Sequence, residues 1–150
     1  PLTMAICGSV YERQKMRNKN DFYPTPHNIV KILANYSEWK SLYVWKPCAG
    51  DFRLVEALQA RDYKVIATDL GQGQDFFDFK EARCPHLMTN PLFKKIRPLI
   101  DHTFAIGVER TVLVCPERLW ACKKGWEQFH RHRPARFINL NWRKDYLGKG

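Results

Sequence analysis

The strongest constraint on the fold is a strand, turn, helix and strand pattern in the first half of the chain. Leu42 to Trp45 is a short apolar run of β-forming residues, and small residues follow in the turn over 46–51. A helical apolar pattern starts near Arg53, and a second strand is predicted over 64–69. Parallel strands need a crossover helix, so the pattern predicts a right-handed βαβ unit.

The alternation of strands and helices continues along the chain. Further strands are predicted over 86–90, 111–115 and 136–142, and helices over 27–36, 95–106 and 120–130. Thr25 is expected to cap the first of these helices, with Pro26 at its first helical position. The chain is therefore predicted to be an α/β fold with a doubly wound, mostly parallel sheet and helices on both faces. The last strand, at the C-terminal end, is expected to be antiparallel.

A chain of 150 residues has the length of a single domain. The segment over 11–20 is basic and lacks clear periodicity, so residues 1–20 are predicted to be a basic N-terminal arm. Residues 21–150 are predicted to be the one domain. No apolar run approaches the ~18 residues that a membrane-spanning helix needs.

The charge balance points to a polyanionic partner. Lys and Arg total 25 against 15 Asp and Glu, which gives a net charge of +10. Such an excess favours nucleic acid over a membrane surface, and solubility alone is the alternative explanation. The five cysteines include no C-x-x-C pair, which disfavours a disulfide framework and a zinc ribbon. We therefore expect no metal site and a reducing cytoplasm.

In parallel α/β sheets, ligands bind at the carboxyl ends of the strands. Residues 47–51 lie at one such end, and Ala49 and Gly50 would let a ligand approach backbone N–H groups. Asp69 ends the next strand, where a carboxylate can accept hydrogen bonds from ribose hydroxyls. These features fit a nucleoside cofactor, and a purely structural role for either one is the alternative. The G-x-G-x-x-G fingerprint of dinucleotide sites is absent.

A second group of residues, Asn90-Pro91-Leu92-Phe93, follows the strand predicted over 86–90. The Asn90 side-chain oxygen and the Pro91 carbonyl can both accept hydrogen bonds from one exocyclic amine. Phe93 can stack on a flat ring. The segment therefore fits a cradle for a planar amine, and an ordinary Asn-Pro turn beside a core phenylalanine is the alternative.

Taken together, these segments resemble a known family. DFYPTP at 21–26, VWKPCAGD at 44–51, Thr68-Asp69 and TNPLF at 89–93 occur in the order and spacing of class I N6-adenine DNA methyltransferases. The likeness is strongest to the small phage and prophage type, and it covers roughly residues 20 to 143. It implies a Rossmann-like methyltransferase fold and a cytoplasmic protein of phage or prophage origin in a bacterial host.

The resemblance implies S-adenosylmethionine as cofactor and an adenine amino group of DNA as methyl acceptor. The cofactor would be bound by Tyr23, Thr25 and Pro26 at its methionine part, by Pro47, Cys48, Ala49, Gly50 and Asp51 around its middle, and by Asp69 at its ribose. Asp75 would meet the adenine of the cofactor, in preference to Asp78. The target base would leave the helix stack and be held by Asn90, Pro91 and Phe93.

Three positions depart from the family pattern. Lys46 stands where the family usually has Glu, Phe52 where it has a second glycine, and Leu92 where it has a second proline. The departures, and the fact that an Asn-Pro cradle suits any planar amine, leave two alternatives open. One is a catalytically impaired methyltransferase-fold protein that binds nucleic acid without methyl transfer. The other is an amino methyltransferase that acts on adenine in RNA or on glutamine in protein.

The predicted sheet and its helices take up most of the 150 residues, so we expect no separate target-recognition domain. Specificity would come from the loops over 70–84 and 116–125, or from a protein partner or self-association. Trp120 and Trp126 fit either half-buried packing or stacking on a base. Phosphate contacts are expected from basic residues of the arm, and from Lys94, Lys95, Arg97, Lys123, Lys124, Arg131, Arg133 and Arg143.

Overall fold

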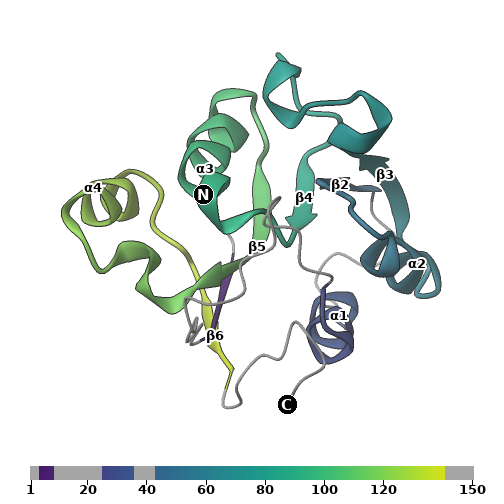
Figure 1. Cartoon of the computed structure of the whole chain (residues 1–150), viewed down its shortest axis with the longest axis horizontal. Coiled ribbons are helices and arrows are strands. Elements are labelled where there is room, and N and C mark those ends of the chain that lie inside the picture. Colours follow the sequence, from purple (N-terminus) through teal and green to yellow (C-terminus); the bar gives the residue numbers. More distant parts are fainter. Residues whose placement is uncertain (1–3, 9–24, 36–42, 141–150) are drawn as a thin grey trace.

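The computed structural model describes residues 4–8, 25–35 and 43–140, and these form one parallel sheet with helices beside it (Figure 1). The order of the six strands is β3-β2-β4-β5-β1-β6. Their bounds are β1 Met4–Gly8, β2 Tyr43–Pro47, β3 Lys64–Thr68, β4 His86–Thr89, β5 Arg110–Pro116 and β6 Phe137–Asn139. Each strand pair in this part of the chain is parallel. The predicted α/β fold with a parallel sheet is confirmed, and it is compatible with a Rossmann-like arrangement.

The structure corrects two expectations about the sheet. Residues 4–8 were assigned to the N-terminal arm, yet they form β1, which pairs with both β5 and β6. The sheet therefore includes the start of the chain, and the rest of the arm lies outside the described residues. The last strand was expected to be antiparallel, yet β6 runs parallel to β1, with Phe137 opposite Ala5. The helix before β6 is the reason, because it returns the chain to the same end of the sheet.

Four α-helices accompany the described strands: α1 His27–Ala34, α2 Arg53–Gln59, α3 Ile96–Ala105 and α4 Lys123–Arg131. Short 3-10 turns are η2 Leu70–Gln72, η3 Phe76–Asp78, η4 Phe93–Lys95 and η5 Glu117–Trp120. The predicted cap of α1 is wrong. Pro26 is the N-cap, without a side-chain cap, because the Thr25 hydroxyl accepts a hydrogen bond from Asn90 instead.

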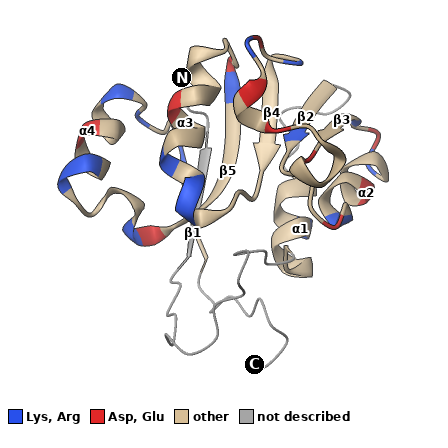
Figure 2. Ribbon diagram, turned by 45° about the horizontal axis from the view of Figure 1, so that its top comes forward, with Lys and Arg blue, Asp and Glu red and all other residues tan. Residues whose placement is uncertain are grey.

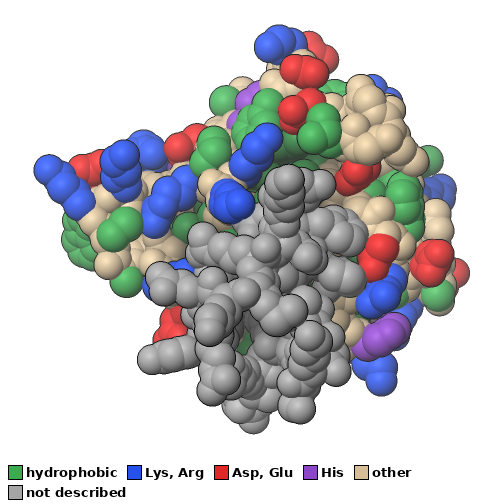
Figure 3. Space-filling view, in the orientation of Figure 1, with side chains coloured by type: hydrophobic (Ala, Val, Ile, Leu, Met, Phe, Trp, Pro, Cys, Tyr) green, Lys and Arg blue, Asp and Glu red, His purple; other side chains and the backbone are tan. Residues whose placement is uncertain are grey.

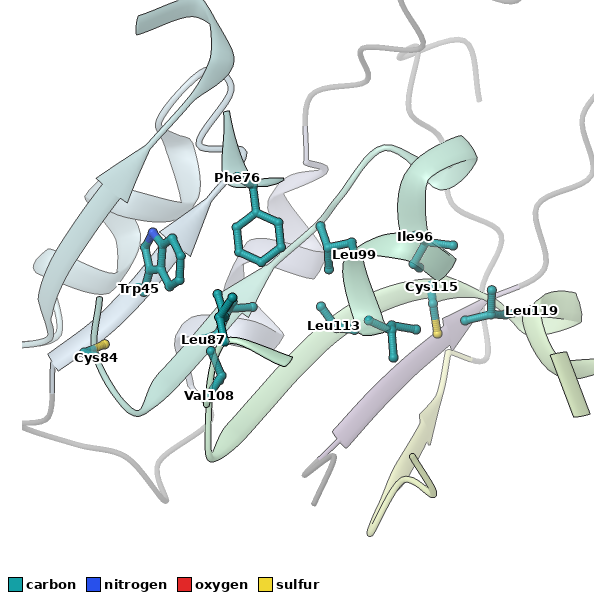
Figure 4. Close-up of a cluster of buried hydrophobic side chains, with 12 residues drawn as sticks. Trp45, Phe76, Cys84, Leu87, Ile96, Leu99, Val108, Leu113, Cys115 and Leu119 are labelled. Atoms are coloured by element: carbon teal, nitrogen blue, oxygen red, sulfur yellow. The ribbon is translucent and has the colours of Figure 1, made fainter. Parts of the chain in front are cut away.

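Successive side chains along each strand point to opposite faces of the sheet, so a hydrophobic core forms on each face. One core contains Trp45, Leu87 and Leu113 from three adjacent strands, packed against α3 and Phe76 (Figure 4). The neighbouring strand residues Val44, Met88, Val112 and Val114 point to the opposite face, where α1 and α2 cover them. The helices therefore lie on both faces, as the hydrophobic pattern predicts.

The register of the central strands brings their carboxyl ends to one edge of the sheet. Pro47 at the end of β2 pairs with Thr68 at the end of β3. On the other side of β2, Trp45 pairs with Leu87 of β4, two residues before Thr89. The segments that follow these three strands therefore meet, as the parallel arrangement requires.

Within the described part of the chain, no helix is both long and apolar enough to cross a membrane.

Candidate functional site: a pocket at the ends of three strands

A pocket of about 440 Å³ lies where the segments after β2, β3 and β4 meet. Its volume falls within the range typical of small-molecule sites. The wall consists of Thr25, Lys46, Cys48, Ala49, Gly50, Asp51, Asp69, Leu70, Gly71, Gln74, Asp75, Phe76, Phe77, Asn90, Pro91, Leu92, Phe93, Lys95 and Leu99. The three strand ends predicted to bind a ligand therefore share one cavity.

The loop after β2 is tightly coiled. Cys48, Gly50 and Phe52 have φ values of 54°, 62° and 62°, so left-handed residues alternate with ordinary ones. The Ala49 N–H donates to the Thr68 carbonyl of the neighbouring strand at 3.1 Å, which ties the loop to the end of β3. Gly50 adopts its conformation without cost, whereas Cys48 and Phe52 carry backbone strain.

Asp69 links the loops after β2 and β3. Its Oδ2 accepts a hydrogen bond from the Gly50 N–H at 2.9 Å, and its Oδ1 accepts one from the Gly71 N–H at 2.8 Å. Each carboxylate oxygen keeps a further lone pair for a ligand. The residue expected to bind a ribose therefore lies in the pocket wall and also fixes the shape of that wall.

Lys46 is only 2% exposed, and its ammonium group is surrounded by acceptors. Nζ donates to the Pro47 carbonyl at 3.1 Å, to the Cys48 carbonyl at 2.6 Å and to the Thr89 hydroxyl at 3.2 Å. Burial lowers the pKa of Lys46 to about 8, although the nearby carboxylates of Asp69 and Asp51 oppose this shift. The Lys46 ammonium group therefore links the loop after β2 to the end of β4 through these hydrogen bonds.

Asn90 presents an acceptor without a protein partner. Its Nδ2 donates to Thr25 Oγ1 at 3.1 Å, whereas its Oδ1 is buried and makes no hydrogen bond. Buried polar atoms without partners are rare, and such an atom in a pocket wall is a candidate ligand contact. Pro91 and Phe93 line the same pocket, so the three residues of the expected amine cradle lie together.

The segment after β3 contributes two aromatic side chains to the pocket wall. Asp75 Oδ1 accepts from the Phe77 N–H at 3.1 Å, which starts a 3-10 turn and places Phe76 and Phe77 in the wall. Lys95 Nζ lies over the Phe77 ring, 5.6 Å from its centroid. Asp75 lines the pocket, whereas Asp78 does not.

The structure brings most of the sequence-predicted site residues to this pocket. Thr25, Cys48, Ala49, Gly50, Asp51, Asp69, Asp75, Asn90, Pro91 and Phe93 line it. Pro26 and Pro47 are adjacent in sequence to wall residues but do not themselves line the pocket. Tyr23 lies outside the described residues.

The three departures have different structural consequences. Phe52, which stands in the place of the second glycine, is absent from the pocket wall and is the N-cap of α2. Leu92 is a wall residue with φ −59° and ψ 124°, which is a conformation that proline adopts. The leucine therefore keeps the backbone course that a second proline would impose.

Sequence reasoning missed several wall residues, most notably Phe76, Phe77 and Lys95. The Asp75-Phe76-Phe77 run carried a usable signal, because an aspartate before two aromatic residues is a natural N-cap for a short turn. Lys95 and Leu99 carried no comparable signal, since both fit the apolar and polar pattern of an ordinary helix start.

The pocket wall has the opposite charge balance to the rest of the chain. It contains three carboxylates, Asp51, Asp69 and Asp75, and two ammonium groups, Lys46 and Lys95. The chain as a whole has a net charge of +10. A ligand with cationic groups is therefore favoured inside the pocket, whereas a polyanion is favoured outside it.

Comparison with protein-family models, curated proteins and solved structures finds no match to this chain.

Proposed function

We propose that this protein is an S-adenosylmethionine-dependent methyltransferase that acts on the N6 amino group of adenine in DNA. The observation that carries the proposal is the buried, unpartnered Oδ1 of Asn90 in a pocket that also contains Asp69 and a left-handed glycine loop. An amine acceptor and a nucleoside-type wall in one cavity fit transfer between a nucleoside cofactor and a planar amine.

The wall fits the proposed cofactor in chemistry and charge. The loop over 48–51 would hold its middle, Asp69 its ribose and Asp75 its adenine, and Phe76 and Phe77 supply flat apolar surface. The carboxylate excess suits a ligand that bears a sulfonium and an ammonium group. When bound, S-adenosylmethionine supplies an electrophilic methyl group.

Asn90 and Pro91 would hold the acceptor. The Asn90 Oδ1 accepts one N–H of the target amine, while Thr25 fixes the opposite end of the same amide. The Pro91 carbonyl accepts the second N–H, and Phe93 stacks on the base. Two acceptors on one amine draw its lone pair out of conjugation with the ring and direct that lone pair to the electrophile.

Basic residues outside the pocket support nucleic acid as the partner. Lys and Arg lie along α4 and around the start of α3 (Figure 2). Lys94 and Lys95 belong to the turn directly after the cradle. Phosphates on both sides of a flipped base could therefore be neutralised beside the pocket. A phage or prophage origin and a bacterial cytoplasmic location form part of the same proposal.

The test is Asn90→Ala, with Asn139→Ala on the exposed β6 as the matched control. Methyl transfer from radiolabelled S-adenosylmethionine to adenine-containing duplex DNA should fall about 10²–10³-fold in Asn90→Ala, the scale for loss of one preorganised polar group. Cofactor affinity by calorimetry should stay within about threefold. Asn139→Ala should match the wild type in both measurements.

Asp69→Ala separates cofactor binding from acceptor chemistry. Loss of its carboxylate should weaken cofactor affinity by about 1–3 kcal/mol, because a charged acceptor and the loop that it fixes are both lost. A wild type that binds the cofactor but methylates RNA or a glutamine-containing protein, and not DNA, would transfer the proposal to that acceptor. A wild type that binds no S-adenosylmethionine would overturn it.

A further inference from the structure

Five aromatic rings form a continuous ridge over η5, α4 and β6, on the side of the sheet away from β3. The ridge consists of Trp120, Trp126, Phe129, His130 and Phe137. From Trp126 the ring centroids follow to His130 at 4.1 Å, on to Phe129 at 6.1 Å and to Phe137 at 6.2 Å. Trp120 closes the far end, 5.3 Å from the Phe137 ring.

Two rings of this aromatic ridge, those of Trp126 and Phe137, are open to solvent. Trp126 is 61% exposed and Phe137 is 43% exposed, and they are two of the four large hydrophobic side chains found exposed among the described residues. Trp120 and Phe129 are half-buried and hold the exposed rings in place. Exposed apolar side chains that belong to one contiguous cluster mark candidate interaction surfaces.

Cations surround the ridge. Residues 118–136 contain six Lys and Arg but only one acidic residue, Glu127. The Arg133 guanidinium lies over the Phe129 ring, 5.8 Å from its centroid. Lys123 precedes Trp126 by three positions on α4, which puts the ammonium on the same helix face as the indole. Figure 3 shows Lys and Arg side chains gathered over the α4 end of the molecule.

Not every charge here is available to a ligand. Asp101 of α3 pairs with Arg131 at 3.2 Å and with His132 at 3.1 Å, which offsets part of the positive charge. Lys123, Lys124 and Arg133 are exposed. The aromatic ridge is therefore flanked by cations that can contact phosphates without breaking the ion pairs of Asp101.

We propose that the aromatic ridge binds unpaired nucleotides of a nucleic acid strand. Base faces in a duplex are covered by neighbouring base pairs, so exposed protein rings can stack only on bases that are unpaired. The cations beside the rings complement the phosphates of the same strand. The combination of rings and cations distinguishes this surface from a purely basic patch, which would bind duplex and single strands alike.

This inference goes beyond the proposed methyl transfer and does not require it, because strand binding can be measured without cofactor. The rings lie on η5, α4 and β6, and none of them is a pocket residue. In an active methyltransferase, the ridge would hold unpaired nucleotides beside a flipped base. In an impaired one, it would be the binding surface itself.

The experiment measures fluorescence anisotropy of a labelled 15-nucleotide oligo(dT) with the intact chain, and of a labelled duplex of equal length. We expect the single strand to bind at least tenfold more tightly than the duplex. Trp126→Ala should weaken single-strand binding roughly 5- to 100-fold, the range for loss of one base stack, and should leave duplex binding within twofold. Trp126→Phe should keep a large part of the single-strand affinity.

Tyr43 and Lys64 provide matched controls at the opposite edge of the sheet. Tyr43 is 54% exposed, and the Lys64 ammonium lies 5.1 Å from the centroid of its ring. Tyr43→Ala removes an exposed aromatic ring and Lys64→Ala removes an exposed ammonium group, as the ridge variants do. Both control variants should leave single-strand affinity within twofold. Lys123→Ala should reduce the salt slope of single-strand binding by about 0.7, the value for one neutralised phosphate.

The outcomes separate the possible uses of the surface. Equal binding of single strand and duplex, with Trp126→Ala unchanged, would mean a purely electrostatic contact and would overturn the proposal. A dimer that dissociates on Trp126→Ala would show that a second copy covers the ridge, and would also overturn it. Loss of oligo(dT) binding in Trp126→Ala with unchanged cofactor affinity would support it, whatever the result for methyl transfer.

Discussion

The Thr25 hydroxyl accepts a hydrogen bond from the Asn90 side chain, with 3.1 Å between Oγ1 and Nδ2, across 65 positions of sequence. This contact fixes the side-chain amide of Asn90 and leaves its Oδ1 as a buried acceptor. Thr25 is itself buried, just before α1, so the residue before a helix on one face of the sheet orients a group at the end of β4.

Thr25→Val should therefore impair the orientation of Asn90 without removing it. A methyl group replaces the hydroxyl, Nδ2 loses its acceptor, and the amide is free to turn Nδ2 toward the amine. We expect a loss of turnover of about tenfold or more, a smaller change in cofactor affinity, and a stability loss of about 1 kcal/mol. Thr25→Ser keeps the hydroxyl and should restore most of the turnover.

Phe52 occupies a left-handed conformation with φ 62°, at the N-cap of α2. A side chain at such a position costs about 1–2 kcal/mol, which glycine avoids. We expect Phe52→Gly to be more stable than Phe52→Ala by about 1 kcal/mol in chemical denaturation, because glycine adopts the left-handed conformation without strain and is also the better N-cap residue. Both variants lose the ring, so their difference reports the backbone preference of this position and not the loss of the side chain.

Cofactor affinity should be the same in Phe52→Gly and Phe52→Ala, because Phe52 is not a pocket residue. A clear gain in affinity for the glycine variant alone would show that the side chain restricts the pocket from outside its wall. An alanine variant as stable as the glycine variant would show that the loop relaxes out of the left-handed conformation.

Local sequence patterns were sufficient for the central part of the fold and insufficient at its edges. The βαβ unit was predictable because the run over 42–45, the turn with Gly50 and the strand over 64–69 each carry their own signal. The strand β1 was missed because five residues beside a basic segment show little alternation. The direction of β6 depends on its partner β1, so no pattern within 137–139 could reveal it.

The site shows the same division between local and long-range information. The position of Asn90 at a strand end followed from the sequence, because the strand before it is apolar and a proline follows it. The hydrogen bonds of Lys46 did not follow from it, since they depend on how closely β2 and β4 approach. A lysine before a proline suggests an exposed charge, and the packing of two strands buries it instead.

The buried Lys46 should make the stability of the protein depend on pH in a specific window. Its pKa is lowered from 10.5 to about 8, chiefly by burial, so the unfolded chain binds the proton more tightly than the folded one. Stability attributable to this group therefore rises as the pH increases from about 8 to about 10.5. Below pH 8 the group is charged in both states, and its contribution does not change.

Lys46→Met removes this titration, and comparison with the wild type isolates it. The unfolding free energy of the wild type relative to Lys46→Met should increase by up to about 3 kcal/mol between pH 7.5 and pH 10.5, the value of the shift in pKa. Urea denaturation of both proteins at several pH values measures the difference. A difference that stays constant over this range would mean that folding does not lower the pKa of Lys46.

Gly125 lies inside α4 at a point where the helix touches its neighbours closely. A Cβ atom there would clash with the Leu119 carbonyl oxygen, and it would lie 2.7 Å from the Trp120 Cα and 3.0 Å from Arg97 Nη1. The first two contacts are with backbone and are too short to accommodate without moving α4.

Glycine in a helix interior ordinarily costs about 0.5–1 kcal/mol relative to alanine, so Gly125→Ala would stabilise an unhindered helix. We expect the opposite result, a loss of about 1–3 kcal/mol from overpacking, in chemical denaturation. Lys124→Ala, at an exposed position next to it, should change stability by less than about 0.5 kcal/mol. A Gly125→Ala variant that is as stable as the wild type would show that α4 does not pack against η5 at this distance.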